Sequence, residues 1–523
     1  MSKWKIKNPD LNVSELVKTI YSARGVSDYR QLFALNEQDF NDPYAINDMQ
    51  VAVDRIMQGI EQKETILVYG DYDVDGITST YLMYETIRTL GGNVSYDIPN
   101  RFVNGYGLTQ TKTYDIINED VDLIITVDNG IKSHDEIDIF EQNNVDVIVT
   151  DHHEVETTLP HATAVLHTDL SDYPFKPLAG VGVAFKLSMA LLGEDALEYT
   201  DLAALGTISD MMPLIDENRA IVNVGLRHLG HSSNIGLRTL MEFLHIQQPS
   251  VADVQFLIAP RLNACGRMKS AKIAVELLQS KTKKEALNTI QRIEDINTNR
   301  KALTKRLYDL AKRTVDTNKP AIIVHSPQMH EGVVGIVASR LANEYGKVAV
   351  VLKEEEFTYK GSIRSYTGVD VYYILTELSG LLLRYGGHQS AAGLEFKKEH
   401  LNTFIEDFNS YIPKAKTHHI IEAEGKLQID EVTLDTIYSL EQYDLKDALF
   451  VFDNLYAHQA YLIKGEHTKL IINNDCEAIF FNNKALYHAI KDHRYVALLG
   501  RLDYNTFRGR TKKQIIIEDF ELI

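Results

Sequence analysis

Short continuous runs of apolar residues alternate with helical patterns through the first third of the chain. The apolar runs are ETILVYG (64–70), NVSYDIP (93–99), VDLIITVD (121–128) and VDVIVTD (145–151). Strands that are buried on both faces have this pattern. The helical patterns that separate the runs lie at 77–90, 107–119 and 133–143. The alternation predicts an α/β fold with a doubly wound parallel sheet, in which ligands bind beyond the carboxyl ends of the strands.

The hydrophobic pattern changes several times along the rest of the chain. Met49, Val53 and Ile56 stand at helical spacing before the first strand, and a second strand–helix–strand pattern starts at residues 321–326. The last part contains short β-type runs such as YVALLG and QIIIEDFELI, which favour a small barrel. We therefore expect a helical lead-in at 1–60, the main α/β domain at 61–270, a long linking helix at 271–315, a smaller α/β domain at 316–412 and a β-barrel at 413–523.

Composition and charge restrict the class of protein. Apolar residues make up 44% of the 523 residues and charged residues 24%, which is typical of globular domains and excludes disordered or fibrous chains. The formal net charge is −19, so no overall basic field attracts nucleic acid or an anionic membrane. Residues 261–313 differ, because fourteen Lys and Arg against five acids give them a local charge of +9. This segment is either a solvated helix face or a local surface for a polyanion.

Cysteine content and hydropathy indicate the cellular compartment. Cys265 and Cys476 are the only cysteines, which excludes a disulfide framework and a cysteine-rich zinc site and agrees with a reducing environment. No apolar run reaches the ~18 residues that a membrane span needs. The first residues also lack the apolar stretch of a signal peptide. We expect a cytoplasmic protein that does not enter a membrane.

Acidic and imidazole side chains follow three of the expected strands. In chain order, with one further Asp after a later helix, they are Asp71, Asp73, Asp75, Asp128, His152, His153 and Asp210. Because the carboxyl ends of parallel strands lie along one edge of a sheet, we expect these groups to meet. A single Asp after a strand is usually a turn or helix cap. Clusters at several strand ends argue against that explanation here.

Carboxylates that meet in this way repel one another strongly, and protonating most of them near pH 7 would be costly. A pair of divalent cations removes the repulsion. Oxygen and imidazole ligands without thiolate favour Mn²⁺ or Mg²⁺, with Zn²⁺ or Co²⁺ as alternatives. Two such ions ~3.5–4 Å apart form the usual clamp for the attack of water on a phosphate. The pattern therefore predicts a metal-dependent hydrolase acting on phosphate esters.

Several motifs together resemble those of the DHH phosphoesterase superfamily. DYDVDG (71–76), VDNG (127–130), DHH (151–153) and GTISDMMPL (206–214) are similar to its four motifs, and GGHQSAAG (386–393) is similar to the signature of the DHHA1 domain. VYGDYDVDGITST, LAGVGVAFKL, APRLNACGRM, EGVVGIVASR and KGSIRS are most similar to the RecJ family of single-strand-specific 5′→3′ exonucleases. The resemblance extends from about Lys3 to the C-terminus and implies that the final barrel is an OB-fold.

The resemblance also implies roles for particular residues. One metal would be held by Asp71, Asp73 and Asp128, and the other by Asp75, Asp128, His152 and Asp210. His153 would act at the scissile phosphate, so we name His153, Asp128 and Asp75 as catalytic. The residues that would bind DNA or its terminal 5′-phosphate are Arg101, Arg267, Ser362, Arg364, Gly387 and His388. In the barrel, cations interleaved with aromatic rings suit a single-strand groove, and the candidates are Tyr504, Phe507, Arg508 and Arg510.

Three functions remain open at this point. The first, which the resemblance favours, is a monomeric 5′→3′ exonuclease on single-stranded DNA in DNA repair and recombination, with a single-strand-binding protein and a RecQ-type helicase as partners. The second is a phosphodiesterase of the same superfamily for short oligonucleotides or cyclic dinucleotides. The third is a non-catalytic replication scaffold. The additional C-terminal segment and the basic helix favour long DNA, and retention of all the acids argues against a scaffold.

Overall fold

The computed structural model describes residues 4–9, 11–99, 107–155, 157–366, 368–412, 421–481, 483–490, 494–507 and 509–523. The chain divides into two compact units. One is Leu35–Thr417, and the other combines Met1–Ala34 with His418–Ile523. Across the described residues, no helix is both long enough and apolar enough to pass through a membrane.

A five-stranded parallel sheet forms the centre of the first part of the larger unit. Its strand order is β3-β2-β4-β5-β6, and every neighbouring pair is parallel. The strands are β2 (Thr65–Tyr69), β3 (Asn93–Asp97), β4 (Leu123–Val127), β5 (Asp146–Thr150) and β6 (Ala164–Leu166). The predicted parallel sheet is confirmed, and β6 is an additional strand. Since β3 and β4 lie on opposite sides of β2, the strand order reverses at β2.

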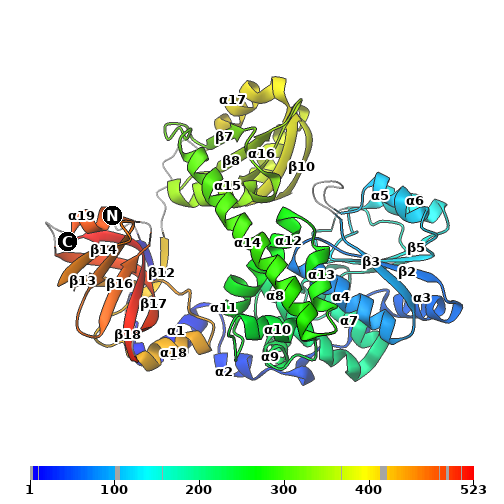
Figure 1. The fold of residues 1–523 in the computed structure, drawn as a ribbon, viewed down its shortest axis with the longest axis horizontal. Coiled ribbons are helices and arrows are strands. Elements are labelled where there is room, and N and C mark those ends of the chain that lie inside the picture. Colours follow the sequence, from blue (N-terminus) through cyan, green and yellow to red (C-terminus); the bar gives the residue numbers. More distant parts are fainter. Residues whose placement is uncertain are drawn as a thin grey trace. The chain divides into compact units, whose positions relative to one another are not determined.

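Both faces of this sheet are buried by helices, as the continuous apolar runs predict (Figure 1). Alternate residues of β2 enter different cores: Ile66 and Val68 face one, and Leu67 and Tyr69 face the other. Burying one such side chain stabilises the fold by roughly 1.5–3 kcal/mol. The helices that contribute to the first core include α3 (Met49–Gln62), α4 (Val74–Thr89) and α7 (Gly180–Leu192), and those of the second are α5 (Gln110–Ile117) and α6 (His134–Gln142).

A helical layer follows the sheet. It contains α8 (Thr200–Ser209), α9 (Asp216–Leu229), α10 (Ile235–Phe243), α11 (Val251–Asp253), α12 (Ala259–Met268) and α13 (Lys272–Leu278). The helix α12 is not predicted from the sequence, because the Pro, Asn and Gly residues of this segment are typical of a loop. Pro260 lies in the first turn, where its missing N–H is not needed. Gly266 allows close packing, since a Cβ there would lie 2.3 Å from the carbonyl oxygen of Tyr72. Arg261 forms an ion pair with Glu294 in the helix that follows.

The predicted linking helix is α14 (Lys283–Lys312), a single helix of 30 residues. It begins later than expected because Thr282 caps a new helix, with its side chain accepting a hydrogen bond from the Glu285 N–H. Ile290 and Ile293 are buried in the core of the parallel sheet. Leu307 belongs to a different core, which it shares with the next domain. One helix, labelled α14 in Figure 1, therefore contributes to two hydrophobic cores.

The smaller α/β domain contains a mixed sheet of order β10-β11-β9-β8-β7, in which only β7 and β8 are parallel. The strands are β7 (Ile322–Ser326), β8 (Ala349–Glu354), β9 (Thr358–Arg364), β10 (Leu382–His388) and β11 (Ala391–Lys397). Its helices are α15 (Glu331–Tyr345), α16 (Val371–Glu377) and α17 (Leu401–Tyr411). The helix α15 packs on β8 and β9 and also contacts α12 and α14.

The smaller unit is an eight-stranded sheet of order β1-β12-β13-β17-β18-β16-β15-β14. Its elements are β1 (Trp4–Asn8), α1 (Leu16–Ala23), α2 (Tyr29–Ala34), β12 (Ile421–Lys426), α18 (Leu434–Gln442), β13 (Phe450–Tyr456), β14 (Gln459–Ile463), β15 (His467–Ile471), β16 (Cys476–Phe480), α19 (Ala485–Ala489), β17 (Tyr495–Phe507) and β18 (Arg510–Leu522). The predicted β-rich C-terminal segment is confirmed.

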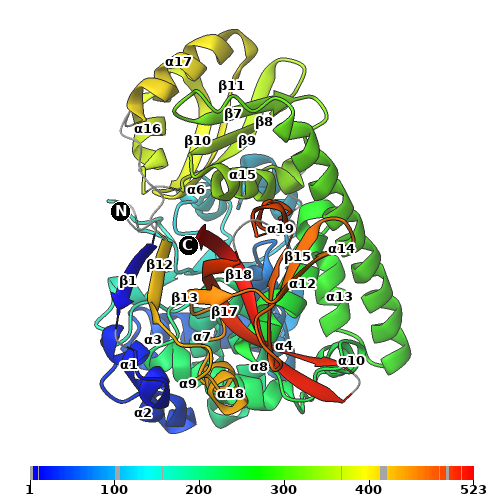
Figure 2. The same ribbon diagram turned by 90° about the vertical axis from the view of Figure 1, so that its left-hand side faces the viewer.

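The expected helical lead-in is wrong at its start, because residues 4–8 form β1. This strand pairs in parallel with β12, as Figure 2 shows, with Trp4 opposite Ile421. Trp4 is 5% exposed, and its indole N–H donates to the Asp519 carboxylate (3.0 Å). The N-terminal residues therefore complete the C-terminal sheet. Only the segment from Leu35 onward belongs to the unit of the parallel sheet.

A buried ion pair joins α7 to α9 behind the sheet. Lys186 and Glu217 are both fully buried and form a short salt bridge. Glu217 also accepts hydrogen bonds from the hydroxyl of Tyr173 (2.7 Å) and from the side-chain amide of Asn41 (2.9 Å). Burial lowers the pKa of Lys186, whereas the nearby Glu217 carboxylate favours the charged form. The charge of Lys186 therefore depends on Glu217.

Replacing Lys186 by Met should destabilise the protein by about 3 kcal/mol, because the Glu217 carboxylate would lose its buried counter-charge. Urea unfolding monitored by circular dichroism measures this change. Lys283→Met removes a lysine that is 64% exposed in its pair with Glu242 and should change the free energy of unfolding by no more than about 0.5 kcal/mol. Equal effects of the two substitutions would contradict the role given to the buried pair.

Candidate metal centre

The acidic residues follow the carboxyl ends of neighbouring strands. Asp71 comes two residues after β2, Asp128 directly after β4, and Asp151 directly after β5. These three strands are adjacent and parallel, so their carboxyl ends lie along one edge of the sheet. The strand order reverses at this edge, which is where open α/β sheets bind ligands. Acids from three distant parts of the sequence are thereby brought together.

The first turn of α4 positions Asp73 and Asp75. Asp73 is the N-cap residue, and its side chain accepts a hydrogen bond from the Gly76 N–H (3.2 Å). Asp75 is 2% exposed, and its two oxygens accept hydrogen bonds from the N–H groups of Gly180 (2.8 Å) and Val181 (2.7 Å). Because these amides open α7, the helix dipole also favours the carboxylate. The LAGVGVAFKL motif thus contributes backbone donors that the sequence analysis did not assign.

Asp128 has a backbone conformation that most residues avoid. Its φ is +59°, in the left-handed region, which Asp tolerates better than most non-glycine residues. Asn129 donates a hydrogen bond to the carbonyl oxygen of Tyr69 (3.2 Å) and so ties the end of β4 to the end of β2. Gly180 must be glycine at this point, since a Cβ would lie 2.5 Å from Asp128 Oδ1. The turn and α7 together fix the Asp128 carboxylate.

Asp151, to which the sequence analysis gave no role, orients the two histidines. Its Oδ1 accepts hydrogen bonds from the backbone N–H groups of His152 (2.7 Å) and His153 (3.1 Å) and lies 2.8 Å from His153 Nδ1. Its Oδ2 accepts a hydrogen bond from the Ile131 N–H (3.0 Å). Burial alone would raise the pKa of Asp151, but these contacts lower it to about 2. The residue is therefore an ionised anchor.

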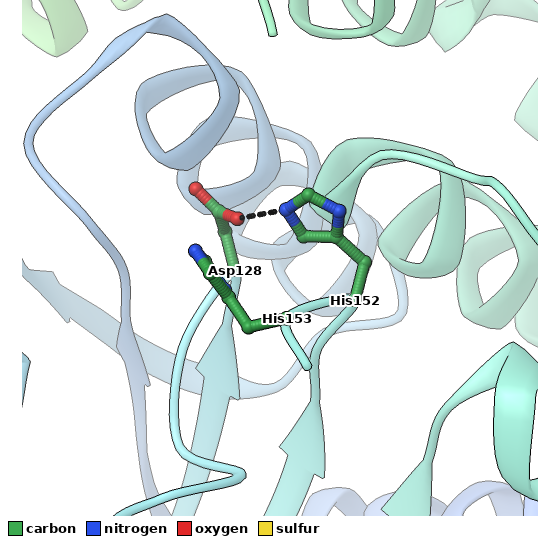
Figure 3. A group of neighbouring side chains, drawn as sticks. All are labelled: Asp128, His152 and His153. Atoms are coloured by element: carbon green, nitrogen blue, oxygen red, sulfur yellow. Dashed lines mark ion pairs between the residues drawn. The ribbon is translucent and has the colours of Figure 1, made fainter. Parts of the chain in front are cut away.

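His152 lies among three carboxylates. Its Nε2 is 3.2 Å from Asp128 Oδ1 and 3.8 Å from one oxygen each of Asp75 and Asp210. Figure 3 shows the His152 ring facing the Asp128 carboxylate. Burial lowers the pKa of His152 to about 4, so the ring is uncharged near neutral pH. In the described part of the chain, nothing donates a hydrogen bond to the buried Asp128 Oδ1. An uncharged imidazole nitrogen surrounded by carboxylate oxygens fits a cation site.

Three overlapping groups of side chains at this edge have ligand atoms within 4.8 Å of one another; one is Asp128 with His152 and His153, and the other two match the predicted ligand sets. These two are Asp71, Asp73 and Asp128 in one set, and Asp75, His152 and Asp210 in the other. Asp128 contacts both sets, since it belongs to the first and approaches His152 of the second. The ligands are oxygen and imidazole without sulfur, which suits Mn²⁺ or Mg²⁺.

Crowding changes the acidity of these carboxyl groups. Burial, followed by repulsion from neighbouring aspartates, raises the pKa of Asp75 and of Asp128 well above the usual range. Burial and the charge of Asp73 raise the pKa of Asp210 to about 6. The folded protein therefore takes up protons here when no cation is bound.

The pKa of His153 is raised, in contrast to that of His152. Burial lowers its pKa, but the hydrogen bond with Asp151 and the negative charges of Asp151, Asp71 and Asp75 together raise the pKa to about 9. The ring is therefore protonated near neutral pH. Its side chain is 38% exposed, so the charged ring is accessible to solvent beside the carboxylates at the sheet edge, which we call the acidic edge. His153 and His152 are neighbours after the same strand (Figure 3), yet their pKa values shift in opposite directions.

The mixed sheet of the smaller domain carries several residues assigned to the terminal phosphate. Ser362 and Arg364 lie on β9, and Arg364 donates a hydrogen bond to the Ser362 hydroxyl (2.6 Å). Arg364 pairs with Ala391 of β11, which pairs with His388 of β10, so Arg364 and His388 share one row across three strands. Gly387 has a φ of +142°, and a Cβ there would lie 2.3 Å from the Ala391 carbonyl oxygen.

The helix α12 links these residues to the acidic edge. Asn263 accepts a hydrogen bond from the Val74 N–H (3.2 Å), between Asp73 and Asp75. Arg267 is one turn further along α12 and contacts α15, where a Cβ on Gly332 would lie 1.8 Å from its carbonyl oxygen. A Cβ on Gly335, which is also part of α15, would lie 2.9 Å from the Arg364 guanidinium. Both arginines thus adjoin α15.

The remaining DNA-binding candidates are placed elsewhere. Tyr504 and Phe507 lie on β17 and Arg510 on β18, all in the smaller unit. The Tyr504 hydroxyl is 3.4 Å from the Glu441 carboxylate, whereas Phe507 is 68% exposed. Two candidates lie outside the described residues, Arg101 and Arg508.

Three parts of the chain match known domain families. Residues 65–207 match the DHH family, N-terminal domain, residues 318–414 match the DHHA1 domain, and residues 423–519 match the RecJ OB domain. The first of these holds most of the acidic edge, and the second holds Ser362 and Arg364. The matches, the parallel sheet and its Asp and His clusters define a DHH–DHHA1 phosphoesterase with a C-terminal OB domain.

Relatives that match nearly the whole chain identify the family within this class of phosphoesterases. The chain is 34% identical to the single-stranded-DNA-specific exonuclease RecJ of Bacillus subtilis, over 99% of this chain and 70% of that protein. It is 32% identical to the RecJ of Dickeya dadantii, over 98% of this chain and 96% of that protein. The crystal structure of Thermus thermophilus RecJ in complex with Mn²⁺ matches with a TM-score of 0.82 at 27% identity, over 99% of this chain and 79% of that one. The chain belongs to the RecJ family.

Adding Mn²⁺ should raise the melting temperature more at pH 8 than at pH 5.5. The pKa values of Asp75, Asp128 and Asp210 lie above the unfolded value of about 4, so the metal-free protein loses stability as pH rises through about 6, the pKa of Asp210, and beyond. A cation removes this repulsion, and protons compete with it at low pH. Differential scanning fluorimetry with Mn²⁺ or EDTA measures the difference.

The variant Asp210→Asn provides a matched control, because it removes one of the repelling charges. Without metal at pH 8, this variant should melt at a higher temperature than the unmodified protein, and Mn²⁺ should stabilise it less. An Mn²⁺ effect that is equal at both pH values, or larger at pH 5.5, would rule out a cation bound by these carboxylates.

Proposed function

We propose that this protein hydrolyses single-stranded DNA from the 5′ end with two divalent cations, Mn²⁺ or Mg²⁺. The observation that carries the proposal is the cluster of buried carboxylates at the sheet edge, in which Asp128 stands between two sets of possible ligands. Two findings on relatives support it. The RecJ proteins that the chain resembles are described as single-stranded-DNA-specific exonucleases, and one of them was crystallised with Mn²⁺.

The chemistry follows from the two sets of ligands. Asp71, Asp73 and Asp128 would hold one cation, and Asp75, Asp128, His152 and Asp210 the other. When bound, such a pair activates a water molecule and offsets the charge that develops on the phosphate. The backbone donors to Asp75 and the hydrogen bonds of Asp151 hold the ligands and histidines in place beforehand.

His153 contributes a proton. With its pKa at about 9, the ring is charged at neutral pH and can donate a hydrogen bond to the scissile phosphate or to the leaving oxygen. Asp151 keeps the ring oriented through the contact with Nδ1, so Nε2 is the nitrogen that can reach the substrate. His153, Asp128 and Asp75 are accordingly the residues on which hydrolysis depends most.

The direction of digestion would depend on recognition of a 5′-phosphate by the smaller α/β domain. Arg364 and Ser362 form a hydrogen-bonded pair on β9. The Arg364 guanidinium and the Arg267 backbone both approach the helix α15. Guanidinium groups match phosphate oxygens because they donate two parallel hydrogen bonds. Gly387 and His388 lie in the same sheet, with little side-chain bulk at the turn. Arg101 would assist from the segment after β3.

The OB domain favours long DNA over short oligonucleotides or cyclic dinucleotides. Exposed Phe507 and Arg510, together with Tyr504 and Arg508, would stack on bases and follow the backbone. We expect the protein to act as a monomer in the cytoplasm, where bacterial DNA lies, in repair and recombination. A single-strand-binding protein and a RecQ-type helicase would supply the single strand.

A substrate panel tests the activity. With Mn²⁺, 5′-labelled single-stranded DNA should be degraded to mononucleotides, while blunt duplex and dinucleotide should be degraded at least about 100-fold more slowly, since specificity of this size needs only about 2.7 kcal/mol. EDTA should abolish hydrolysis. Asp75→Ala and His153→Ala should be inactive but fold normally by circular dichroism. Hydrolysis that persists in EDTA, or cleavage of the dinucleotide alone, would overturn the proposal.

Substitution of Arg364 tests the phosphate pocket. Arg364→Ala should reduce the preference for 5′-phosphorylated over 5′-hydroxyl strands by about tenfold, the value of one charge-assisted hydrogen bond. Initial rates on the two strands give this ratio. Lys397→Ala is a suitable control because Lys397 lies at the far end of β11, opposite Thr358, and it should leave the ratio unchanged. An unaltered ratio in Arg364→Ala would remove the pocket from the proposal.

A further inference from the structure

The middle of α14 carries a polar stripe between two apolar anchors. Ile296 belongs to the core of the parallel sheet and Leu307 to the core below α15. Between them, Asn297, Arg300 and Thr304 stand at spacings of three and four residues, so they share one face of the helix. Asn297 and Thr304 are buried, with exposed fractions of 1% and 2%. A stripe of this kind is costly unless its polar groups are satisfied.

Two atoms of this stripe have no partner within the described residues. They are the side-chain oxygen of Asn297 and Nε of Arg300, both buried. Other arginines of this region are paired: Arg261 with Glu294, and Arg292 with Glu276. The structure shows no carboxylate of the described residues within ion-pairing distance of Arg300. The amide of Asn297 can present either its oxygen or its NH₂ group, because the two are distinguished only by their hydrogen bonds.

Arg300 is also surrounded by other cations. Burial lowers its pKa, and the nearby guanidinium groups of Arg267 and Arg340 lower it further. Arg340 projects from α15 and lies 5.9 Å above the ring of Tyr308, with no described carboxylate paired to it. The helices α12, α14 and α15 contact one another and carry these three arginines, one on each helix. Like charges that meet in a partly buried place require an anion.

We propose that Arg300 and Arg340 bind an internal phosphate of the substrate strand, beside the pocket for the terminal phosphate. The proposal rests on the proposed activity and extends it to two residues that were given no role from the sequence, Arg300 in α14 and Arg340 at the end of the EGVVGIVASR segment. Arg267 contributes to both places, because it approaches α15 near Gly332 and lies within range of Arg300. The α15 glycines at 332 and 335 allow close packing, because a Cβ would lie 1.8 Å from the Arg267 carbonyl oxygen at the first and 2.9 Å from the Arg364 guanidinium at the second.

An internal phosphate is the ligand that the arrangement favours. The terminal phosphate already has Arg364 and Ser362, which are hydrogen-bonded to each other on β9. Arg300 lies on α14, which packs on α12, and Arg340 lies on α15, which packs on both α12 and β9. Because α12 contacts the Asp73–Asp75 turn and β9 carries Arg364, both arginines adjoin the elements that a strand between the two places would follow. Two arginine forks match the two free oxygens of a phosphodiester. The partly buried site strengthens the attraction compared with an exposed lysine.

Single methylphosphonate linkages, which are neutral, identify the phosphate. Release of the first nucleotide is measured with Mn²⁺ on 5′-phosphorylated single strands that carry one such linkage at the second, third or fourth position. For the unmodified protein, one position should lower kcat/KM by roughly tenfold. Arg300→Gln and Arg340→Gln should each be slower by a similar factor on ordinary DNA and should show no additional loss at that position. Arg292→Gln, on the same helix, should behave as the unmodified protein.

A stability measurement separates substrate binding from a structural role. Because Arg300 is repelled by its neighbours and partly desolvated, Arg300→Gln should melt at the same or a higher temperature than the unmodified protein. If Arg300→Gln does not fold, Arg340→Gln, whose side chain is exposed, gives the same linkage test. An unchanged methylphosphonate profile in both variants would overturn the inference. If the unmodified protein releases no nucleotide at all, the proposed activity itself fails instead.

Discussion

Repulsion among carboxylates at the edge of the parallel sheet is the constraint on which the rest of the structure depends. Asp71, Asp75 and Asp128 are each at most 3% exposed, so their charges are almost removed from water. Burying an unpaired charge costs several kcal/mol even after relaxation. Backbone N–H groups reduce this cost at Asp75 but cannot cancel it. The fold therefore maintains a site whose carboxyl groups either take up protons or bind cations.

A second concentration of charge, of the opposite sign, lies along α14 and α15. The whole chain carries −19, yet this does not prevent a polyanion from approaching. Charges separated by more than about 8–10 Å are largely screened at physiological salt. The local arrangement of Arg267, Arg300 and Arg340 therefore decides what binds there. The two clusters complement each other, because cations at one and phosphates at the other belong to the same substrate complex.

Apolar periodicity predicted the fold well where strands and helices are close in sequence. The four apolar runs are strands, and the approach of Asp128 to His152 follows from the parallel order of β4 and β5. Strand β1 was missed although WKIKN alternates, because its partner β12 lies more than 400 residues away. The helix α12 was missed because Gly266 is needed for contact with Tyr72, not for a turn. Asp151 received no role because sequence does not show where a carboxylate points.

The helices α12 and α14 explain how the two clusters can be held at a fixed distance. Asn263 of α12 binds the backbone between Asp73 and Asp75, and Arg267 follows one turn later. The helix α14 packs along α12 and enters a core at each end, with Arg300 between the two. Movement of either arginine relative to the acidic edge would require repacking of one of these cores. Interiors resist such repacking because they are as dense as organic crystals, so hydrophobic packing holds these arginines in place relative to the carboxylates of the parallel sheet.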